Sequence, residues 1–335
     1  MIPELFFICF PDTNAPIGGI KQIYRQASLI NQLGGKAWVV HESGDFRVGW
    51  FKNETPVIGL EELKQRGMNP HTDVLIFPET FHEASTQFAP GIGKIFFNQN
   101  AYYSLGIKEV NPQFANGYGD PELFFHLFVS QDNEALASYI FNLPSNSTGI
   151  LKNGIDTELF APRPREAGGK ELEVAYMIRK NPDHVSKLLL ICQQRGLLSR
   201  ARFTELSNLQ EAEVASQLAR ARIFLSFEYP AGFGLPPAEA MASGCVVVGY
   251  HGQGGKDYFQ SSHCHPISYG DWRDFANTLE TLITIAEHQP ERLDSMGAKA
   301  RRFIEANYSL RAERFAAEGT WNQAFAAWER WKAAR

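Results

Sequence analysis

The sequence has few cysteines and no long apolar run. It contains four cysteines among 335 residues and no CxxC pair, which excludes a disulfide scaffold and is typical of thiols that stay reduced. Aliphatic runs are short, such as residues 188–191, whereas a membrane-spanning helix needs about 20 apolar residues. The N-terminal apolar run lacks a cationic start and breaks at Pro11. We therefore expect a buried first strand, no signal peptide, no transmembrane segment and a cytoplasmic protein.

An excess of basic charge is also missing. Lys and Arg number 32 against 37 Asp and Glu, a net charge of −5, and no basic run resembles a nucleic-acid-binding arm. We therefore expect no nucleic-acid partner. The first 158 residues carry a net charge of −7 and the remainder +2, which places any polyanion site in the second half. The acidic first half also lacks the clustered cations that attract anionic lipid.

Several signatures of catalysis and cofactor binding do not occur. There is no GxSxG, HExxH or GxxxxGK[ST] motif, no DxD pair to hold a catalytic metal ion, and no GxGxxG after the first strand. These absences weigh against a serine hydrolase, a zinc protease, a P-loop NTPase and an NAD enzyme. The adjacent His263, Cys264 and His265 lack a second, distant ligand pair, so we expect no metal site.

Short runs rich in Val, Ile and Phe alternate with helical segments. This pattern predicts βαβ units with parallel sheets, an α/β fold, and two sets of runs predict two doubly wound halves in tandem. The predicted strands are residues 5–10, 37–41, 73–77, 94–97 and 127–130 in the first half, and residues 173–178, 202–206, 223–227 and 246–250 in the second.

A linker separates the two sets of strands. Residues 161–170 contain two prolines and two glycines, which favours a hinge between a domain of residues 1–160 and one of residues 161–315. From Trp272 onward the pattern is almost entirely helical. Trp321, Phe325 and Trp328 recur at the spacing of one helix face. This stripe predicts that the last helix, about residues 316–335, docks on the rest of the protein.

The most informative segment spans residues 223–250. An apolar strand ends at Phe227, a glycine-containing loop follows, and Pro236 and Pro237 stand where a helix tolerates proline, near its start. Free N–H groups at such a helix start attract phosphate. Glu239 is expected in the first helical turn, where two roles fit: it accepts hydrogen bonds from a ribose diol, or it complements the helix dipole.

The segment GFGLPPAEAMASG, residues 232–244, resembles the donor-binding signature of retaining GT-B glycosyltransferases of the family 4, or group 1, type. Other motifs follow in the same order: Gly18-Gly19 after the first strand, KNGIDTELFAP at residues 152–162, and Gly254-Gly255 followed by Asp257. The resemblance extends from about residue 4 to the C-terminal helix. It implies two Rossmann-like domains that face a cleft, with the C-terminal helix packed back on the N-terminal domain.

The resemblance also implies a donor site. Arg179 and Lys180 resemble the basic pair that holds the donor diphosphate and stabilises its departure; from the residues alone, a solvated strand end is the competing interpretation. The glycine pair after the first strand also fits an ordinary turn. Ser207, Asn208 and Leu209 are implied to border the base. The remaining donor-binding residues implied are Gly18, Gly19, Lys187, Gly232, Phe233, Gly234, Leu235 and Glu239.

The sequence departs from the family pattern at two places. Ala231 occupies the position of a glutamate that contacts the donor sugar in the family, and Glu228 is the candidate substitute. A histidine near the reacting sugar is replaced by the amides Asn98 and Asn100, which either bind a sugar hydroxyl or cap the following turn. The acceptor is expected near the residues that follow DVLIF, namely Glu79, Thr80, His82 and Glu83.

The resemblance implies transfer of a sugar from a nucleotide-diphospho-sugar, UDP- or GDP-linked, to a saccharide or lipid-linked acceptor. It implies retention, no metal and no further cofactor. The protein is then cytoplasmic, with peripheral contact at the inner membrane surface if the acceptor is lipid-linked. Two alternatives stay open: a catalytically impaired relative that acts as a nucleotide-sugar-binding or scaffold subunit, which Ala231 favours, and a sugar-nucleotide epimerase.

Overall fold

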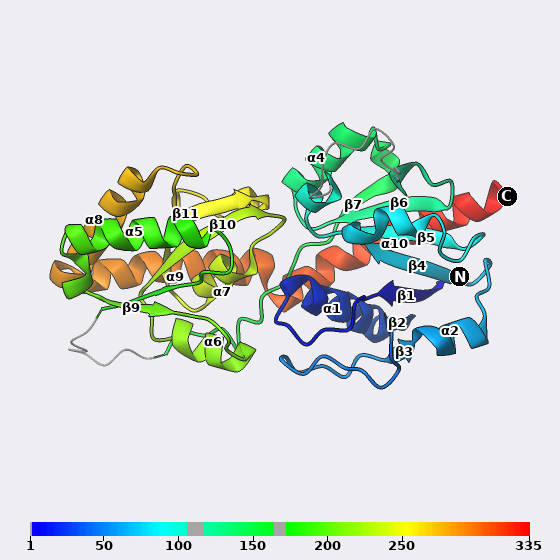
Figure 1. Ribbon diagram of the computed structural model, residues 1–335, viewed down its shortest axis with the longest axis horizontal. Coiled ribbons are helices and arrows are strands. Elements are labelled where there is room, and N and C mark those ends of the chain that lie inside the picture. The colour runs from blue at the N-terminus through cyan, green and yellow to red at the C-terminus, as the bar shows by residue number, and fades with distance from the viewer. Residues whose placement is uncertain (1, 106–116, 164–171) are drawn as a thin grey trace. The chain divides into compact units, whose positions relative to one another are not determined.

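The computed structural model describes residues 2–105, 117–163 and 172–335, and the chain forms two compact units (Figure 1). The first comprises Met1–Lys152 and Arg314–Arg335, and the second Asn153–Glu313. The boundaries expected from the sequence, after residues 160 and 315, lie eight and two residues further along. Of the expected linker at residues 161–170, all but the first three residues lie outside the described part of the chain.

The first unit contains a seven-stranded parallel sheet in the order β3-β2-β1-β4-β5-β6-β7. Its central strands are mostly apolar and are buried almost along their whole length, as expected for a parallel sheet covered on both faces. The strands are β1 (Glu4–Ile8), β2 (Lys36–His41), β3 (Val57–Gly59), β4 (Asp73–Pro78), β5 (Gly93–Asn98), β6 (Leu123–Phe128) and β7 (Thr148–Ile150). The short strands β3 and β7 are absent from the sequence prediction, and β6 begins four residues earlier than predicted.

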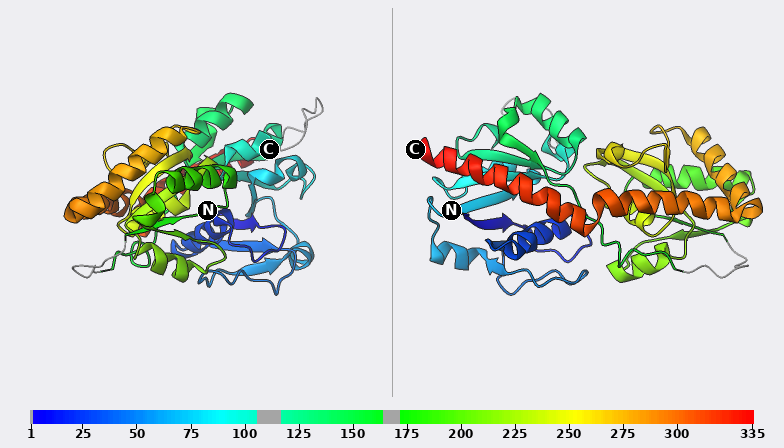
Figure 2. Two further views of the ribbon diagram at one scale, coloured as in Figure 1. Left: turned by 60° about the vertical axis from the view of Figure 1, so that its left-hand side comes forward. Right: turned by 180° about the vertical axis from the view of Figure 1, so that it is seen from behind.

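The helices of the first unit cover this sheet. They are α1 (Gly18–Gln32), α2 (Leu60–Arg66), α3 (His82–Ser85), α4 (Gln131–Phe141) and most of α10 (Leu310–Ala333), with 3-10 turns η1 (Glu79–Phe81), η2 (Ala101–Leu105), η3 (Gly117–Gly119) and η4 (Ser145–Ser147). In the rear view of Figure 2, α10, in red, crosses the face of the sheet. Trp321 Nε1 donates to Gln26 Oε1 at 3.1 Å, and its ring meets Phe7 edge-on. Docking of the last helix through its aromatic stripe is confirmed.

The second unit contains a five-stranded parallel sheet in the order β12-β11-β10-β8-β9. Its strands are β8 (Glu173–Tyr176), β9 (Arg202–Glu205), β10 (Ile223–Ala231), β11 (Val246–Gln253) and β12 (His265–Pro266), of which only the two-residue β12 is absent from the sequence prediction. Its helices are α5 (Pro182–Gln194), α6 (Glu211–Leu218), α7 (Leu235–Ala242), α8 (Trp272–His288) and α9 (Pro290–Tyr308), with 3-10 turns η5 (Leu197–Ser199) and η6 (Gly254–Asp257).

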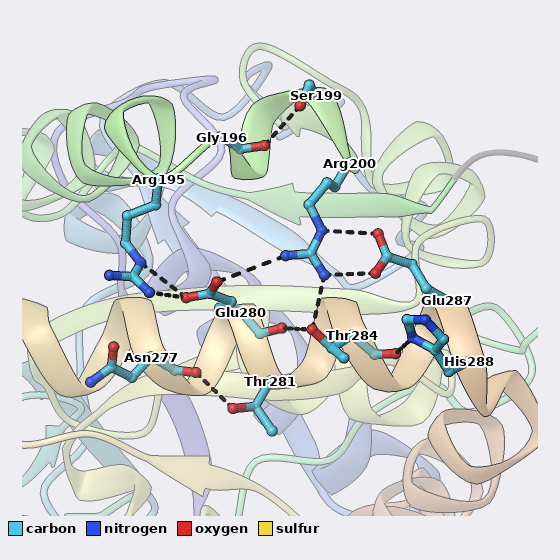
Figure 3. Close-up of polar contacts among 10 residues, drawn as sticks. All are labelled: Arg195, Gly196, Ser199, Arg200, Asn277, Glu280, Thr281, Thr284, Glu287 and His288. Carbon is cyan, nitrogen blue, oxygen red and sulfur yellow. Dashed lines mark hydrogen bonds and ion pairs between the residues drawn. The ribbon is translucent and has the colours of Figure 1, made fainter.

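Ion pairs connect α8 to Arg195, which follows α5, and to Arg200, which follows η5 (Figure 3). Arg200 forms two parallel hydrogen bonds with the Glu287 carboxylate, Nε to Oε1 at 2.9 Å and Nη2 to Oε2 at 2.6 Å, and Arg195 pairs with Glu280. The Arg200 guanidinium lowers the pKa of Glu287. The two-bond geometry fixes both side chains, so this network holds α8 in place at the surface beyond what its buried apolar face supplies.

The four cysteines are free and buried. Burial raises the pKa of Cys9 to about 12 and that of Cys192 to about 11, so both thiols stay protonated near neutral pH. Within the described ranges, no helix combines the length and apolar character needed to span a bilayer.

Candidate functional site

The loops that follow parallel strands collect at one edge of a sheet, where α/β proteins bind ligands. In the second unit, most of the sequence-predicted residues lie in the loops after β8, β9, β10 and β11, which are neighbours in that sheet, and Glu228 lies near the end of β10 itself. The fold therefore brings residues that are up to 76 positions apart in sequence to the carboxyl edge of one sheet. They are Arg179, Lys180, Ser207, Leu209, Glu228, Gly232, Phe233, Gly234, Leu235, Gly254 and Gly255.

Helix α7 begins one residue earlier than the sequence suggests, at Leu235, after Gly234 in a left-handed conformation with φ of 86°. The first four N–H groups at a helix start have no partner within the helix. Two of those four positions are Pro236 and Pro237, which have no N–H. The expected helix-end donors for a phosphate are therefore reduced to the N–H groups of Gly234 and Leu235.

The glycine turn before α7, residues 232–234, packs against the buried side chain of Tyr258. Phe233 is buried against Tyr258, at 4.9 Å between ring centroids, and the Tyr258 hydroxyl donates to the carbonyls of Phe233 and Gly234. Gly254 lies so close to this turn that a Cβ on it would stand 1.8 Å from the Gly232 carbonyl oxygen. Phe233, expected to bind the donor, instead supports the turn from the core.

Glu239 lies on α7 and is 8% exposed. It is the fifth residue of the helix, and the first turn of α7 contains no acidic residue. Its expected placement in the first turn is therefore wrong, and a role as a simple complement to the helix dipole loses its basis because the dipole acts within the first turn. The ribose-binding role stays a prediction.

Lys180 follows β8 and is held by β10. Its Nζ donates to the Pro230 carbonyl at 2.7 Å and lies 3.3 Å from Glu228 Oε2. The side chains of Lys180 and Glu228 are 18% and 11% exposed. Arg179, the other member of the basic pair, is exposed, and its side chain forms no hydrogen bond or ion pair with the residues that the structure describes. One cation is thus anchored at the sheet edge and the other is open to solvent.

Glu228 and Ala231 flank an irregularity in β10. The register with β11 shifts between them, and Ala231 is 2% exposed. The Glu228 carboxylate is engaged by Lys180, so its expected role as a substitute for the family glutamate requires that this ion pair open. A glutamate placed at position 231 would be buried.

Lys187 already has two partners on its own unit. Its Nζ lies 2.5 Å from Asp183 Oδ2, one turn earlier on α5, and 4.7 Å from the centre of the Trp272 ring. These contacts do not fit the expected role of a cation that holds a diphosphate.

The proposed base-binding segment lies after β9. Ser207 and Asn208 are exposed and Leu209 is half-buried. Asn208 adopts a left-handed conformation with φ of 55°. These side chains therefore lie at the sheet edge, and no contact among the described residues indicates which of them would bind the base.

Sequence reasoning missed two features of this edge. Asn181, between Lys180 and the first residue of α5, bonds to β10 through its side chain. The rings of Tyr229 and Tyr269 stack with centroids 4.0 Å apart, and Tyr269 is 48% exposed. The Asn181-Pro182 dipeptide is a helix-start signal that points to Asn181, whereas nothing in the sequence pairs the two tyrosines.

In the first unit, the glycine pair opens α1 at the carboxyl edge of the sheet. Gly18 and Gly19 are the first two residues of α1 and are partly exposed. Gln99, in the loop after β5, donates from Nε2 to the Gly19 carbonyl at 3.0 Å. This half-buried amide, absent from the predicted site, connects the glycine pair to the β5 loop.

The two amides flanking Gln99 are structural. Asn98 is fully buried and donates from Nδ2 to Ser104 Oγ at 3.0 Å and to the Tyr118 hydroxyl at 2.7 Å. Asn100 is 4% exposed, and its Oδ1 accepts from the Tyr102 N–H at 3.3 Å. Burial and these bonds do not fit the expected contact of Asn98 with an acceptor, and for Asn100, counted with Arg179, Lys180 and Glu228 as a candidate catalytic residue, they favour the turn-capping role over contact with a sugar hydroxyl.

Glu79, expected on the acceptor side, lies beneath the β5 loop. It is 4% exposed and its Oε2 accepts from the Gln99 N–H at 3.0 Å. Its burial raises the pKa of the carboxyl to about 7, although backbone N–H groups of Gln99, Glu79 and Asn100 oppose that shift. Glu79 therefore fixes this loop, and its burial does not fit the expected contact with an acceptor. His82, the other acceptor-side candidate, begins α3.

The raised pKa of Glu79 predicts a pH-dependent stability. The folded state holds a proton on Glu79 that the unfolded state releases near pH 4.5, so the contribution is present below that pH and is lost as pH rises through about 7. We expect the stability of wild type relative to Glu79→Gln to fall by about 3 kcal/mol from pH 4.5 to pH 8. Urea unfolding at each pH measures this difference; the surface variant Glu61→Gln is the control, and a pH-independent difference for Glu79→Gln would contradict the assignment.

Among the described residues, no group of three or more His, Cys, Asp and Glu side chains is placed to hold a metal ion. In the His263-Cys264-His265 cluster, His263 Nε2 bonds to the Tyr258 carbonyl at 2.6 Å and its ring stacks on Phe303. The cluster thus packs the loop before β12.

The second unit resembles a known protein family. Residues 173–303 match the family of glycosyl transferases group 1. This span contains every strand of the second unit's sheet and every predicted residue at its carboxyl edge.

One characterised relative matches a short stretch. The chain is 39% identical over 70 residues to an α-1,6-glucosyltransferase of Actinobacillus pleuropneumoniae serotype 7, a match that covers 21% of this chain and 20% of that protein. The chain thus aligns with about a fifth of the length of the curated relative.

Solved structures resemble the whole chain. Sucrose-phosphate synthase from Thermosynechococcus elongatus has a TM-score of 0.74 at 14% identity over 97% of this chain and 100% of its own. HepE from Anabaena in complex with UDP-glucose has a TM-score of 0.70 at 13% identity over 94% and 98%. The catalytic domain of starch synthase IV from Arabidopsis thaliana, bound to ADP and acarbose, has a TM-score of 0.69 at 12% identity over 97% and 100%. The expected GT-B fold is confirmed.

Proposed function

We propose that this chain is a glycosyltransferase that moves a sugar from a nucleotide-diphospho-sugar to a saccharide or lipid-linked acceptor. The observation that carries the proposal is the carboxyl edge of the second unit, where Lys180, the glycine turn before α7 and Glu239 fall within the span that matches group 1 glycosyl transferases. The fold likeness to HepE, solved with UDP-glucose, supports a nucleotide-sugar donor. We further propose that the donor is UDP- or GDP-linked.

The donor diphosphate would rest at the start of α7. Lys180 and Arg179 supply positive charge, and the N–H groups of Gly234 and Leu235 supply hydrogen-bond donors. As the bond between the sugar's anomeric carbon and the β-phosphate oxygen breaks, its electron pair stays on the phosphate. Donors fixed in advance around that oxygen lower the barrier because they need no reorganisation. Glu239 would bind the ribose hydroxyls.

The remaining parts of the proposal concern the acceptor and the stereochemistry. Retention at the anomeric carbon, a metal-independent reaction and membership of family 4 rest on the resemblance of residues 232–244. The first unit would bind the acceptor near Gln99, a partly exposed residue at its sheet edge, and Gly18 and Gly19 stay predicted donor contacts. A lipid-linked acceptor would bring the protein to the inner membrane surface from the cytoplasm.

A binding subunit without transfer activity is the second candidate. Ala231 is buried where the family has a sugar-contacting glutamate, and Glu228 is paired with Lys180. This candidate predicts nucleotide-sugar binding without sugar transfer.

A ligand screen followed by a transfer assay tests the proposal. A nucleotide sugar at 100 times its dissociation constant should raise the free energy of unfolding by about 2.7 kcal/mol, which a thermal-shift scan detects. With saccharide acceptors present, we expect release of the nucleoside diphosphate and a glycosylated product. Binding without product in any acceptor would favour the binding subunit, isomerised nucleotide sugar without acceptor would indicate an epimerase, and no stabilisation by any nucleotide sugar would refute the proposal.

A further inference from the structure

Asn181 lies in the loop that carries Lys180, and its side chain connects this loop to two other segments of the second unit. It lies between β8 and α5 in a left-handed conformation with φ of 51°. Its Nδ2 donates to the carbonyls of Phe227 and Tyr229, both at 2.8 Å, and its Oδ1 accepts from the Tyr269 hydroxyl at 3.2 Å. The side chain thus ties the β8–α5 turn to the end of β10.

This use of an asparagine at a helix start is unusual. An asparagine at the N-cap position normally accepts a hydrogen bond from the first turn of its own helix, but α5 has no such side-chain cap. The Asn181 main-chain carbonyl accepts from His184 and Val185 instead. Its side chain therefore does not cap α5 and instead donates hydrogen bonds to the backbone of β10.

The neighbouring lysine binds the same stretch of β10. Lys180 Nζ donates to the Pro230 carbonyl, and the carbonyls that Asn181 holds belong to residues 227 and 229. The side chains of residues 180 and 181 therefore donate hydrogen bonds to three carbonyls within residues 227–230, just before the glycine turn of residues 232–234. The position of Lys180 relative to that turn depends on this double attachment.

We propose that Asn181 is a positioning residue that fixes Lys180 beside the glycine turn before α7. Without its side chain, the β8–α5 turn loses two bonds to β10, and Lys180 keeps only its own contacts with Pro230 and Glu228. The consequence for ligand binding rests on the proposed function, because it takes the ligand of Lys180 to be a nucleoside diphosphate.

The placement of Lys180 is measured without any ligand. In wild type, the contacts with Pro230 and Glu228 should protect Lys180 from acetylation by acetic anhydride, relative to the exposed Lys64, as read by mass spectrometry. In Asn181→Gly, which keeps the left-handed backbone accessible, labelling of Lys180 should rise several-fold. Asn181→Asp, which keeps the shape but has no donor, should behave in the same way. The matched control is Asn142→Gly, a left-handed asparagine that ends α4 in the first unit. Equal labelling of Lys180 in wild type and both Asn181 variants would overturn the inference.

The functional link is measured by calorimetric titration of the full chain with UDP and GDP. Asn181→Gly should weaken the nucleotide that wild type binds by about tenfold or more, as small misplacements of a binding group do. If Asn181 acts through Lys180, the double variant with Lys180→Met should bind as weakly as Lys180→Met alone. Additive losses would overturn the positioning role, since a merely structural residue weakens binding whether or not Lys180 is present.

Failure of the proposed function gives a different pattern. If wild type binds neither UDP nor GDP while labelling of Lys180 still rises in Asn181→Gly, the positioning inference stands and the assignment of UDP or GDP as the ligand is overturned. Unfolding midpoints measured for every variant verify that each one is folded in both experiments.

Discussion

Lys180→Met is expected to lower the rate of sugar transfer by about 10²–10³-fold. Lys180 is the cation held at the carboxyl edge of the second sheet, 2.7 Å from the Pro230 carbonyl and 3.3 Å from Glu228. Methionine retains the length of the side chain and removes the charge that would stabilise the departing phosphate. Loss of the cation also leaves Glu228 as an uncompensated, mostly buried carboxylate, which repels a diphosphate.

Steady-state kinetics with the nucleotide sugar found in the ligand screen measure this effect. The matched control is Lys187→Met, which removes a cation that already has Asp183 and Trp272 as partners, and we expect it to change the rate less than about twofold, in the range of a surface ion pair. A rate for Lys180→Met within a few-fold of wild type, or an equal loss in Lys187→Met, would contradict the assignment of Lys180.

Gly254→Ala is expected to reduce nucleotide affinity about 10²-fold. A Cβ at this position would stand 1.8 Å from the Gly232 carbonyl oxygen and 2.3 Å from its carbonyl carbon. These are backbone atoms, so no side-chain rotation relieves the overlap, and the start of η6 and the glycine turn must separate. The turn then no longer presents the N–H groups of Gly234 and Leu235. Overpacking should also lower the free energy of unfolding by ~1–3 kcal/mol.

The neighbouring glycine provides the control. At Gly255 the nearest backbone atom to an added Cβ is the Phe233 carbonyl oxygen at 3.4 Å, an ordinary contact. Gly255→Ala should therefore bind UDP or GDP within about threefold of wild type, because the added methyl group meets its neighbours only at ordinary van der Waals distances although the site is buried. Calorimetric titration of both variants measures the contrast. Equal affinities in Gly254→Ala and wild type would show that the glycine turn does not form the binding site.

Local patterns predict most of this fold because parallel strands buried on both faces are continuous apolar runs. All nine predicted strands overlap an observed one. The exceptions have physical causes: β3, β7 and β12 are two or three residues long, too short to show a pattern. The start of β6 is displaced because the sequence LFFHLF contains His126, which pattern reading treats as polar. In the fold, His126 is 3% exposed, and burial lowers its pKa to about 3, so it is neutral and behaves as a core residue.

The candidate site could be predicted from the sequence where its basic residues and glycines directly follow the end of a strand. The loops after β8, β10 and β11 carry a basic pair and glycines, and strand topology alone places them at one edge. The individual roles were less predictable, since they depend on tertiary contacts. The burial of Phe233 under Tyr258, the pairing of Glu228 with Lys180 and the diversion of Asn181 to β10 join residues that are 25 to 48 positions apart.

In the first unit, too, the roles of individual residues depend on tertiary contacts that the sequence does not show. Three polar residues at or just after the ends of β4 and β5 fit substrate contacts by type, yet Glu79, Asn98 and Asn100 are all buried. Glu79 accepts from the Gln99 N–H, and Asn98 donates to Ser104. Gln99, which lies between the two asparagines in sequence, is the residue whose side chain contacts Gly19. Residue type alone does not distinguish the roles of Asn98, Gln99 and Asn100. These roles depend on the course that the chain takes after β5.

A crystal structure of the full chain with UDP or GDP would locate the nucleotide. We expect the diphosphate to lie against the start of α7, within hydrogen-bonding distance of the Gly234 and Leu235 N–H groups and of Lys180 Nζ, with the ribose on Glu239. A nucleotide bound elsewhere on the chain, or a glycine turn filled by the protein's own side chains at saturating nucleotide, would contradict it.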